Sequence, residues 1–283
     1  MSEPSTNPQS QSHVVKRHGV TTRVWHWVNA LCLLVLLMSG LQIFNAHPSL
    51  YWGSGSDFDN PIMSIGAQLD DAGDPMGYLA IAGWQVPTTG VLGYSGPEGQ
   101  KQARAFPAWA TLPDSQWLSL GRQWHFTAAW VFGVLLVGYL FYSIVSRRRR
   151  RLIGVHRGEL GQFGHAVVEH AKLKFERRPG YNIIQKLTYL LVLGVLLPLM
   201  ILTGLTMAPA IDAAWPWLTY VFGGRQSART IHFISAFSLV GFFVIHLVLV
   251  LVSGLVNNMR AMTTGGYRVD ADAPSPATER DHD

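Results

Sequence analysis

The sequence predicts an all-α integral membrane protein, a four-helix transmembrane bundle with a long extracytoplasmic loop. Apolar residues make up 48% of the 283-residue chain and charged residues only 14%, and the apolar residues gather in long blocks. A helix needs roughly 20 such residues to cross a bilayer. Four blocks reach this length, at 24–44, 124–146, 183–207 and 231–256. No strand-like alternation is evident between them.

Single residues refine two of the predicted spans. Cys32, the only cysteine, lies in the first span, where it can form no internal disulfide and is expected to be a packing residue. Pro198 lies within the third span and predicts a kink there.

The charges between the spans predict the orientation. Segment 147–182 carries ten Lys or Arg and three Glu, whereas segment 45–120 carries seven acidic residues and two basic ones. Because basic loops stay in the cytoplasm, 147–182 is expected inside and 45–120 outside. The polar tails, 1–20 and 266–283, are then both cytoplasmic. The membrane domain is expected to cover 21–265, without a cleavable signal peptide before it.

The long outer segment, 45–120, has two open interpretations. It is either a flexible insert that caps the bundle or a docking surface for an extracytoplasmic partner. The net charge of +5 does not indicate nucleic-acid binding, because the basic residues flank apolar helices. Membrane lipid is the expected contact of these helices.

Four histidines lie in the predicted spans: His26, His125, His232 and His246. An ionisable side chain in a transmembrane helix is costly, so it usually has a partner and a function. His232 and His246 are fourteen residues apart, which is about 21 Å along a helix and within roughly 40° of the same face.

The predicted orientation pairs these histidines by depth. His125 matches His232 near the outer surface, and His26 matches His246 near the inner surface. The inner match is looser, because His246 lies about ten residues before the end of its predicted span. Two imidazoles fill both axial positions of a haem iron and favour electron transfer over oxygen chemistry. The sequence therefore predicts two bis-histidine b-type haems.

Other residues are candidates for neighbouring roles. His18 is an alternative to His26 as a ligand, and with Asn182 it is a candidate for a quinone site. Haem propionates need cations at the membrane edges. The propionate candidates are Arg23 and Arg260 on the inner side, and Arg122, Arg225 and Arg229 on the outer side.

With these residues in hand, the chain resembles the di-haem cytochrome b subunits of membrane-bound nickel–iron hydrogenases, formate dehydrogenases and thiosulfate reductases. The resemblance covers roughly 17–265, without the outer segment, and rests on RVWHWVNAL, WHF, and RTIHF with a second histidine fourteen residues on. YNIIQKLTYL, FGGRQSARTIHF and NNMRAMTTGGY are most similar to the thiosulfate-reductase-like branch. The resemblance implies the four histidines as ligands, a quinone site near the inner haem, and an extracytoplasmic molybdoenzyme or hydrogenase partner.

The expected function is electron transfer between the quinone pool and this partner, in the bacterial cytoplasmic (inner) membrane. The chain shows no convincing substrate-converting site, so it is expected to be a subunit rather than a complete enzyme. A histidine-relay proton channel or transporter is one alternative, although Leu239 and Phe243 separate His232 from His246. A cofactor-free membrane anchor is the other.

Overall fold

The computed structural model describes residues 13–145, 187–188 and 190–269. The chain forms two compact units. The first contains Met1–Val28, Leu152–Thr188 and Phe242–Asp283, and the second contains Asn29–Arg151 and Tyr189–Gly241.

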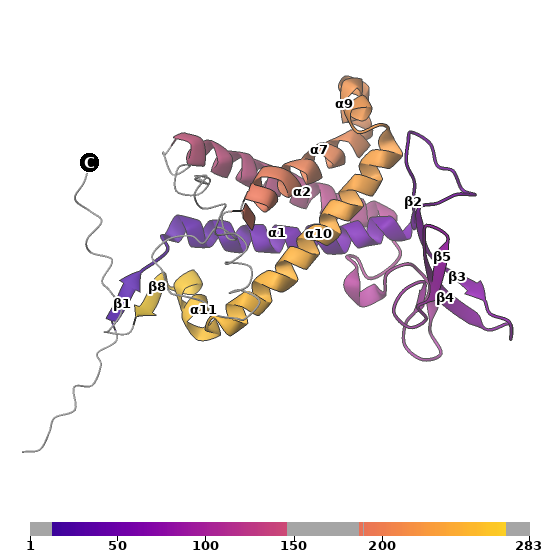
Figure 1. Cartoon of the computed structure of the whole chain (residues 1–283), viewed down its shortest axis with the longest axis horizontal. Helices are drawn as coiled ribbons and strands as arrows, with labels where there is room; N and C mark the ends of the chain where they lie inside the picture. Colours follow the sequence, from indigo (N-terminus) through magenta and orange to yellow (C-terminus); the bar gives the residue numbers. More distant parts are fainter. Residues whose placement is uncertain (1–12, 146–186, 189, 270–283) are drawn as a thin grey trace, which may run out of the picture. The chain divides into compact units, whose positions relative to one another are not determined.

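Three helices in the described part of the chain are long and apolar enough to cross a membrane. They are α1 (Val20–Asn45), α2 (Leu118–Val145) and α10 (Arg225–Val252) (Figure 1). These helices correspond to three of the four predicted spans and confirm that the chain is a helical membrane protein.

The predicted third span, 183–207, begins outside the described residues, so the four-helix bundle stays a prediction. Its described part is a π-helical turn, η2 (Val192–Leu196), that continues into α7 (Leu197–Met207). Pro198 has no N–H to donate to the carbonyl one turn earlier, and its ring crowds that carbonyl. The wider π-turn before it relieves this crowding. Where the sequence predicts a kink at Pro198, the structure thus has a π-helical turn just before it.

Two short helices follow α7, and prolines set their boundaries. They are α8 (Pro209–Ala214) and α9 (Pro216–Val221). A residue that precedes proline is pushed out of the helical region. Ala208 is accordingly extended, and Trp215 also leaves helical geometry.

Glycines delimit α10 at both ends. Gly223 and Gly224 precede it with φ of 71° and 113°, and Gly254 follows it with φ of 107°. After Gly254 the chain forms α11 (Leu255–Thr263) and then β8 (Gly266–Val269), which pairs antiparallel with β1 (His13–Lys16).

The outer segment 45–120 contains β-structure, so the expectation of a loop without strands in an all-α chain is wrong. Four strands form one antiparallel sheet in the order β2-β3-β4-β5 (Figure 1). They are β2 (Ser49–Leu50), β3 (Met63–Leu69), β4 (Pro75–Ile81) and β5 (Trp84–Pro87). A smaller pair, β6 (Tyr94–Ser95) and β7 (Gln102–Ala103), precedes the 3₁₀ turn η1 (Ala108–Ala110).

The sheet packs on the end of α1. One apolar cluster joins Phe44 of α1 to Leu50 and Ile65 of the sheet and to Phe106. Phe233 of α10 lies against Phe44, with ring centroids 4.8 Å apart. The outer segment therefore shares a core with the helices.

The outer segment also caps the start of α10. The carbonyl of Gly53 accepts hydrogen bonds from the backbone N–H groups of Gln226 and Ser227, at 3.0 and 3.1 Å. The Thr230 hydroxyl donates to the carbonyl of Tyr51 at 2.7 Å. The two bonds to Gly53 satisfy N–H groups that a helix start leaves unpaired. Together with the Thr230 bond they hold the outer segment on α10, which argues against the interpretation of this segment as a flexible insert.

Candidate functional site

The structure brings His125 and His232 together. Each lies seven residues after the first residue of its helix, α2 or α10. Their ring centroids are 6.3 Å apart, with an angle of 61° between the ring planes. With metal–nitrogen bonds of about 2 Å, two imidazoles on opposite sides of one iron have ring centroids roughly 6 Å apart. The observed separation fits this arrangement.

A hydroxyl group from a neighbouring helix holds each of these two rings. Nδ1 of His125 lies 3.1 Å from Oγ of Ser39 on α1, and Nδ1 of His232 lies 2.9 Å from Oγ1 of Thr203 on α7. These hydroxyl residues were not identified from the sequence.

The hydrogen-bond pattern fixes the tautomer of both rings. Each hydroxyl donates its single proton to the backbone carbonyl four residues earlier, Ser39 to Val35 and Thr203 to Leu199, both at 2.6 Å. A carbonyl can only accept, so each hydroxyl oxygen must in turn accept from the imidazole. The proton of each ring is therefore on Nδ1, which leaves the Nε2 lone pair available for a metal.

A glycine follows each hydroxyl residue and leaves space beside the ring. A Cβ added at Gly40 would lie 3.4 Å from Cε1 of His125, and one added at Gly204 would lie 3.5 Å from Cε1 of His232. The next nearest atom to each added Cβ is Nδ1, so both glycines leave room beside the Nδ1–Cε1 edge of the ring, next to the hydroxyl that holds it. The Ser–Gly and Thr–Gly pairs in these helices are the sequence signal that could have located the hydroxyls.

The inner histidines, His26 and His246, belong to the same compact unit. His26 lies six residues after the start of α1, and His246 lies six residues before the end of α10, because α10 ends at Val252 rather than at 256. The predicted end of this span at 256 is thereby corrected, and the pairing of His26 with His246 stays a prediction. The ring of His246 stacks on Phe242, with centroids 6.0 Å apart.

Two of the predicted propionate arginines lie on α10 before His232. The Arg229 guanidinium donates to the backbone carbonyl of His47 and lies 5.4 Å from the centroid of the Phe44 ring. Arg225 donates to the carbonyl of Met207 at 3.1 Å.

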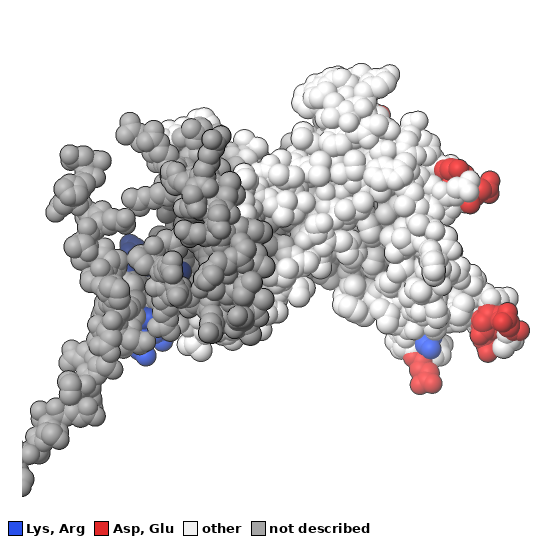
Figure 2. All heavy atoms as spheres, in the orientation of Figure 1, with Lys and Arg blue, Asp and Glu red and all other residues white. Residues whose placement is uncertain are grey.

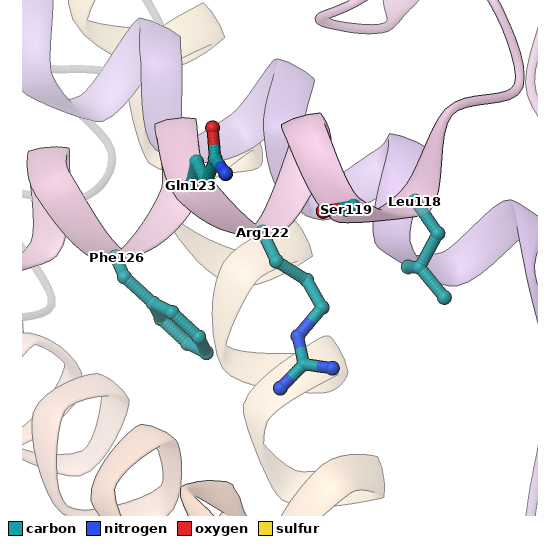
Figure 3. Close-up of a pocket in the computed structure, with 5 residues that line it drawn as sticks. All are labelled: Leu118, Ser119, Arg122, Gln123 and Phe126. Atoms are coloured by element: carbon teal, nitrogen blue, oxygen red, sulfur yellow. The ribbon is translucent and has the colours of Figure 1, made fainter.

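Arg122 lines a groove of about 520 Å³ at the start of α2 (Figure 3). Leu118, Ser119, Gln123 and Phe126 are its other lining residues. Figure 3 shows Arg122 and Phe126 on one side of the helix and Gln123 on the other. The Arg122 guanidinium lies 5.6 Å from the centroid of the Phe126 ring. Phe126 directly follows His125 in the sequence.

At the inner end, the Arg23 guanidinium donates to the backbone carbonyl of Thr263, at the end of α11. Arg260 lies in the last turn of the same helix. His18 lies just before α1, and its backbone N–H donates to the carbonyl of Gly265. Asn182 lies outside the described residues.

The outer segment is strongly acidic at its surface. Arg104, one of its two bases, is buried and donates to the carbonyls of Phe106 and Asp114 and to the Thr111 hydroxyl. Burial lowers the pKa of Arg104. Lys101 is therefore the only exposed base between residues 45 and 120, all of which the structure describes, and Figure 2 shows the acidic side chains in separate groups on this part of the surface.

Comparison with known proteins gives one curated relative. It is a putative protein-methionine-sulfoxide reductase subunit, YedZ1, from Azospira oryzae. It is 29% identical over 243 residues, which are 82% of this chain and 89% of the relative. No solved structure matches the chain.

The model of one protein family, the prokaryotic cytochrome b561 family, matches residues 17–265. This match covers most of the chain and confirms the prediction of a b-type cytochrome with haem. The chain therefore belongs to the prokaryotic cytochrome b561 family of membrane electron-transfer proteins.

Proposed function

We propose that the chain is a di-haem cytochrome b that transfers electrons between a quinone pool and a redox enzyme subunit outside the cytoplasmic membrane. The observation that carries this proposal is the outer pair, His125 and His232, with ring centroids 6.3 Å apart and both Nε2 atoms available. When bound, the haems would supply one-electron carriers at two depths in the membrane.

The chain's own residues would hold both groups. His125 and His232 would hold the outer haem, and His26 and His246 the inner one. The arginines that the sequence suggests for the haem propionates remain candidates for that role. Arg229 is the best supported of them, because it lies one helical turn before His232 with its guanidinium fixed by the carbonyl of His47.

The proposed quinone site lies at the inner end of the chain. His18 lies eight residues before His26, and both belong to the same compact unit. A quinone bound beside His18 would therefore be near the inner haem ligands, and this imidazole is suited to exchange a proton with it. Asn182 stays a second candidate on sequence grounds.

The proposed partner docks on the outer sheet. The register places Trp84 opposite Ile81 and Val86 opposite Leu79 on one apolar face. Leu79 packs on the core, whereas Trp84 is 83% exposed. An exposed apolar strip within an acidic segment suits a redox subunit with a basic surface.

The relative's name, a sulfoxide reductase subunit, supports a redox enzyme as the partner. The alternatives predicted from the resemblance are a molybdoenzyme and a hydrogenase. Trp84→Ser should reduce co-purification of the proposed redox subunit. Undiminished co-purification would show that the partner does not dock at Trp84.

A spectrum of the purified protein tests the core of the proposal. The reduced-minus-oxidised difference should show b-type bands, with two haems per chain, and a quinol analogue should reduce them. One haem per chain would reject the inner or outer site. Absence of haem would leave a cofactor-free anchor.

A further inference from the structure

We infer that Ser39 and Thr203 are a matched pair of positioning residues that set the electron-donating strength of both axial histidines of the outer haem. This inference rests on the proposed function, because it requires His125 and His232 to bind one iron. Neither hydroxyl would touch the haem iron. Each would act through the imidazole that it holds.

The two hydroxyls have equivalent surroundings on different helices. Ser39 lies on α1 and Thr203 on α7, and both residues are 0% exposed. Water therefore cannot take over either hydrogen bond. Each oxygen donates to its own helix and accepts from one imidazole. The same arrangement thus occurs twice, once for each ligand of the pair.

This hydrogen bond has a defined effect on a bound iron. When Nδ1–H donates to an oxygen, the imidazole becomes a more basic ligand at Nε2. A more basic ligand stabilises the ferric state relative to the ferrous state, which lowers the midpoint potential. Removal of either hydroxyl should therefore raise the midpoint potential of the outer haem. The inner haem should keep its potential, because His26 and His246 are far along α1 and α10 from these residues in sequence.

The variants that test this are Ser39→Ala and Thr203→Val, which remove the hydroxyls with little change in shape. Ser39→Thr and Thr203→Ser retain a hydroxyl and should restore the wild-type potential. Thr206→Val is the matched control on α7. Thr206 is 1% exposed, and its hydroxyl donates to the carbonyl of Leu202 at 2.9 Å.

The measurement is a potentiometric titration of the b-type bands, with electron paramagnetic resonance of the ferric haems. We expect Ser39→Ala and Thr203→Val to shift the same haem upward, and the double variant to shift it further. Loss of that haem from both variants, with retention in Ser39→Thr, Thr203→Ser and Thr206→Val, would overturn the inference, because the hydroxyls would then secure the haem without tuning its ligands.

Unchanged potentials and ferric signals in haem-containing Ser39→Ala and Thr203→Val would overturn the inference. A shift of one haem in Ser39→Ala and of the other haem in Thr203→Val would also overturn the inference. A wild-type protein without haem would instead reject the proposed function, so the two failures are distinguishable.

Discussion

Among single residues, the outer histidines give a prediction that tests their pairing. His125→Ala and His232→Ala should each reduce the haem content from two to one per chain, because a bis-histidine haem needs both ligands. The same spectral component should be lost from both variants. Pyridine haemochrome analysis and redox titration measure content and component. His156→Ala, in the segment between the second and third spans, is the control and should keep both haems.

His47 predicts a pH dependence outside the membrane spans. Burial and the charge of Arg229 lower the pKa of His47 from its usual 6.5. As pH falls below about 6.5, the unfolded chain takes up a proton that the folded chain resists, so stability is lost. His47→Phe keeps a ring to stack on Tyr51, 5.6 Å away, and removes this titration.

The melting temperature of the wild type should therefore fall more than that of His47→Phe when pH drops from about 7 to about 5.5. The difference should be roughly 2 °C, because the ring is only half-buried. Equal losses in the two proteins would show that His47 does not contribute.

The residues of the candidate site differ in how well the sequence predicts them. The histidines are visible because charged or titratable groups are rare in apolar blocks. Ser39 and Thr203 are not, because a hydroxyl in a helix ordinarily bonds only to its own backbone. Only the packing of α1 on α2 and of α7 on α10 shows which hydroxyls meet an imidazole.

Among the elements, the start of α10 depends on a close backbone contact. A Cβ at Gly224 would lie 2.4 Å from the carbonyl oxygen of Gly53, and φ of Gly224 is 113°. Gly224→Ala should therefore destabilise the protein by at least about 2 kcal/mol. Thermal unfolding in detergent measures this.

Gly241→Ala is the matched control for this variant, because nothing lies within 4 Å of a Cβ at Gly241 in the same helix. It should be neutral or stabilising by up to about 1 kcal/mol. Equal melting temperatures of the two variants would show that the Gly53 contact does not limit stability.

The outer strands show why elements can be missed from sequence. β3 alternates between apolar and small or polar residues, but β4 is apolar on both faces and lacks that pattern. The β4–β5 turn is Ala82–Gly83, with φ of 49° and 84°. Such a turn usually contains Asn or Asp before glycine, and this pair is the sequence pattern by which a hairpin is predicted. The chain has alanine in that position, so the pattern is missing. The long helices, by contrast, follow directly from their apolar length.

For the molecule as a whole, the orientation in the membrane would decide which of the two proposed haems faces the proposed partner. The charges of 45–120 and 147–182 predict that the first segment is outside and the second inside. The chain suits cysteine labelling, because Cys32 is its only cysteine and is buried. Thr89 is exposed in the outer segment and provides a labelling position there.

In a Cys32→Ser background, Thr89→Cys should react with a membrane-impermeant maleimide on intact spheroplasts. Gly161→Cys, placed in the basic segment, should react only after lysis, because the membrane then no longer shields it. The reverse labelling pattern would show that the chain has the opposite orientation in the membrane. His125 and His232 would then lie on the cytoplasmic side, and the acidic sheet would have to dock a cytoplasmic partner.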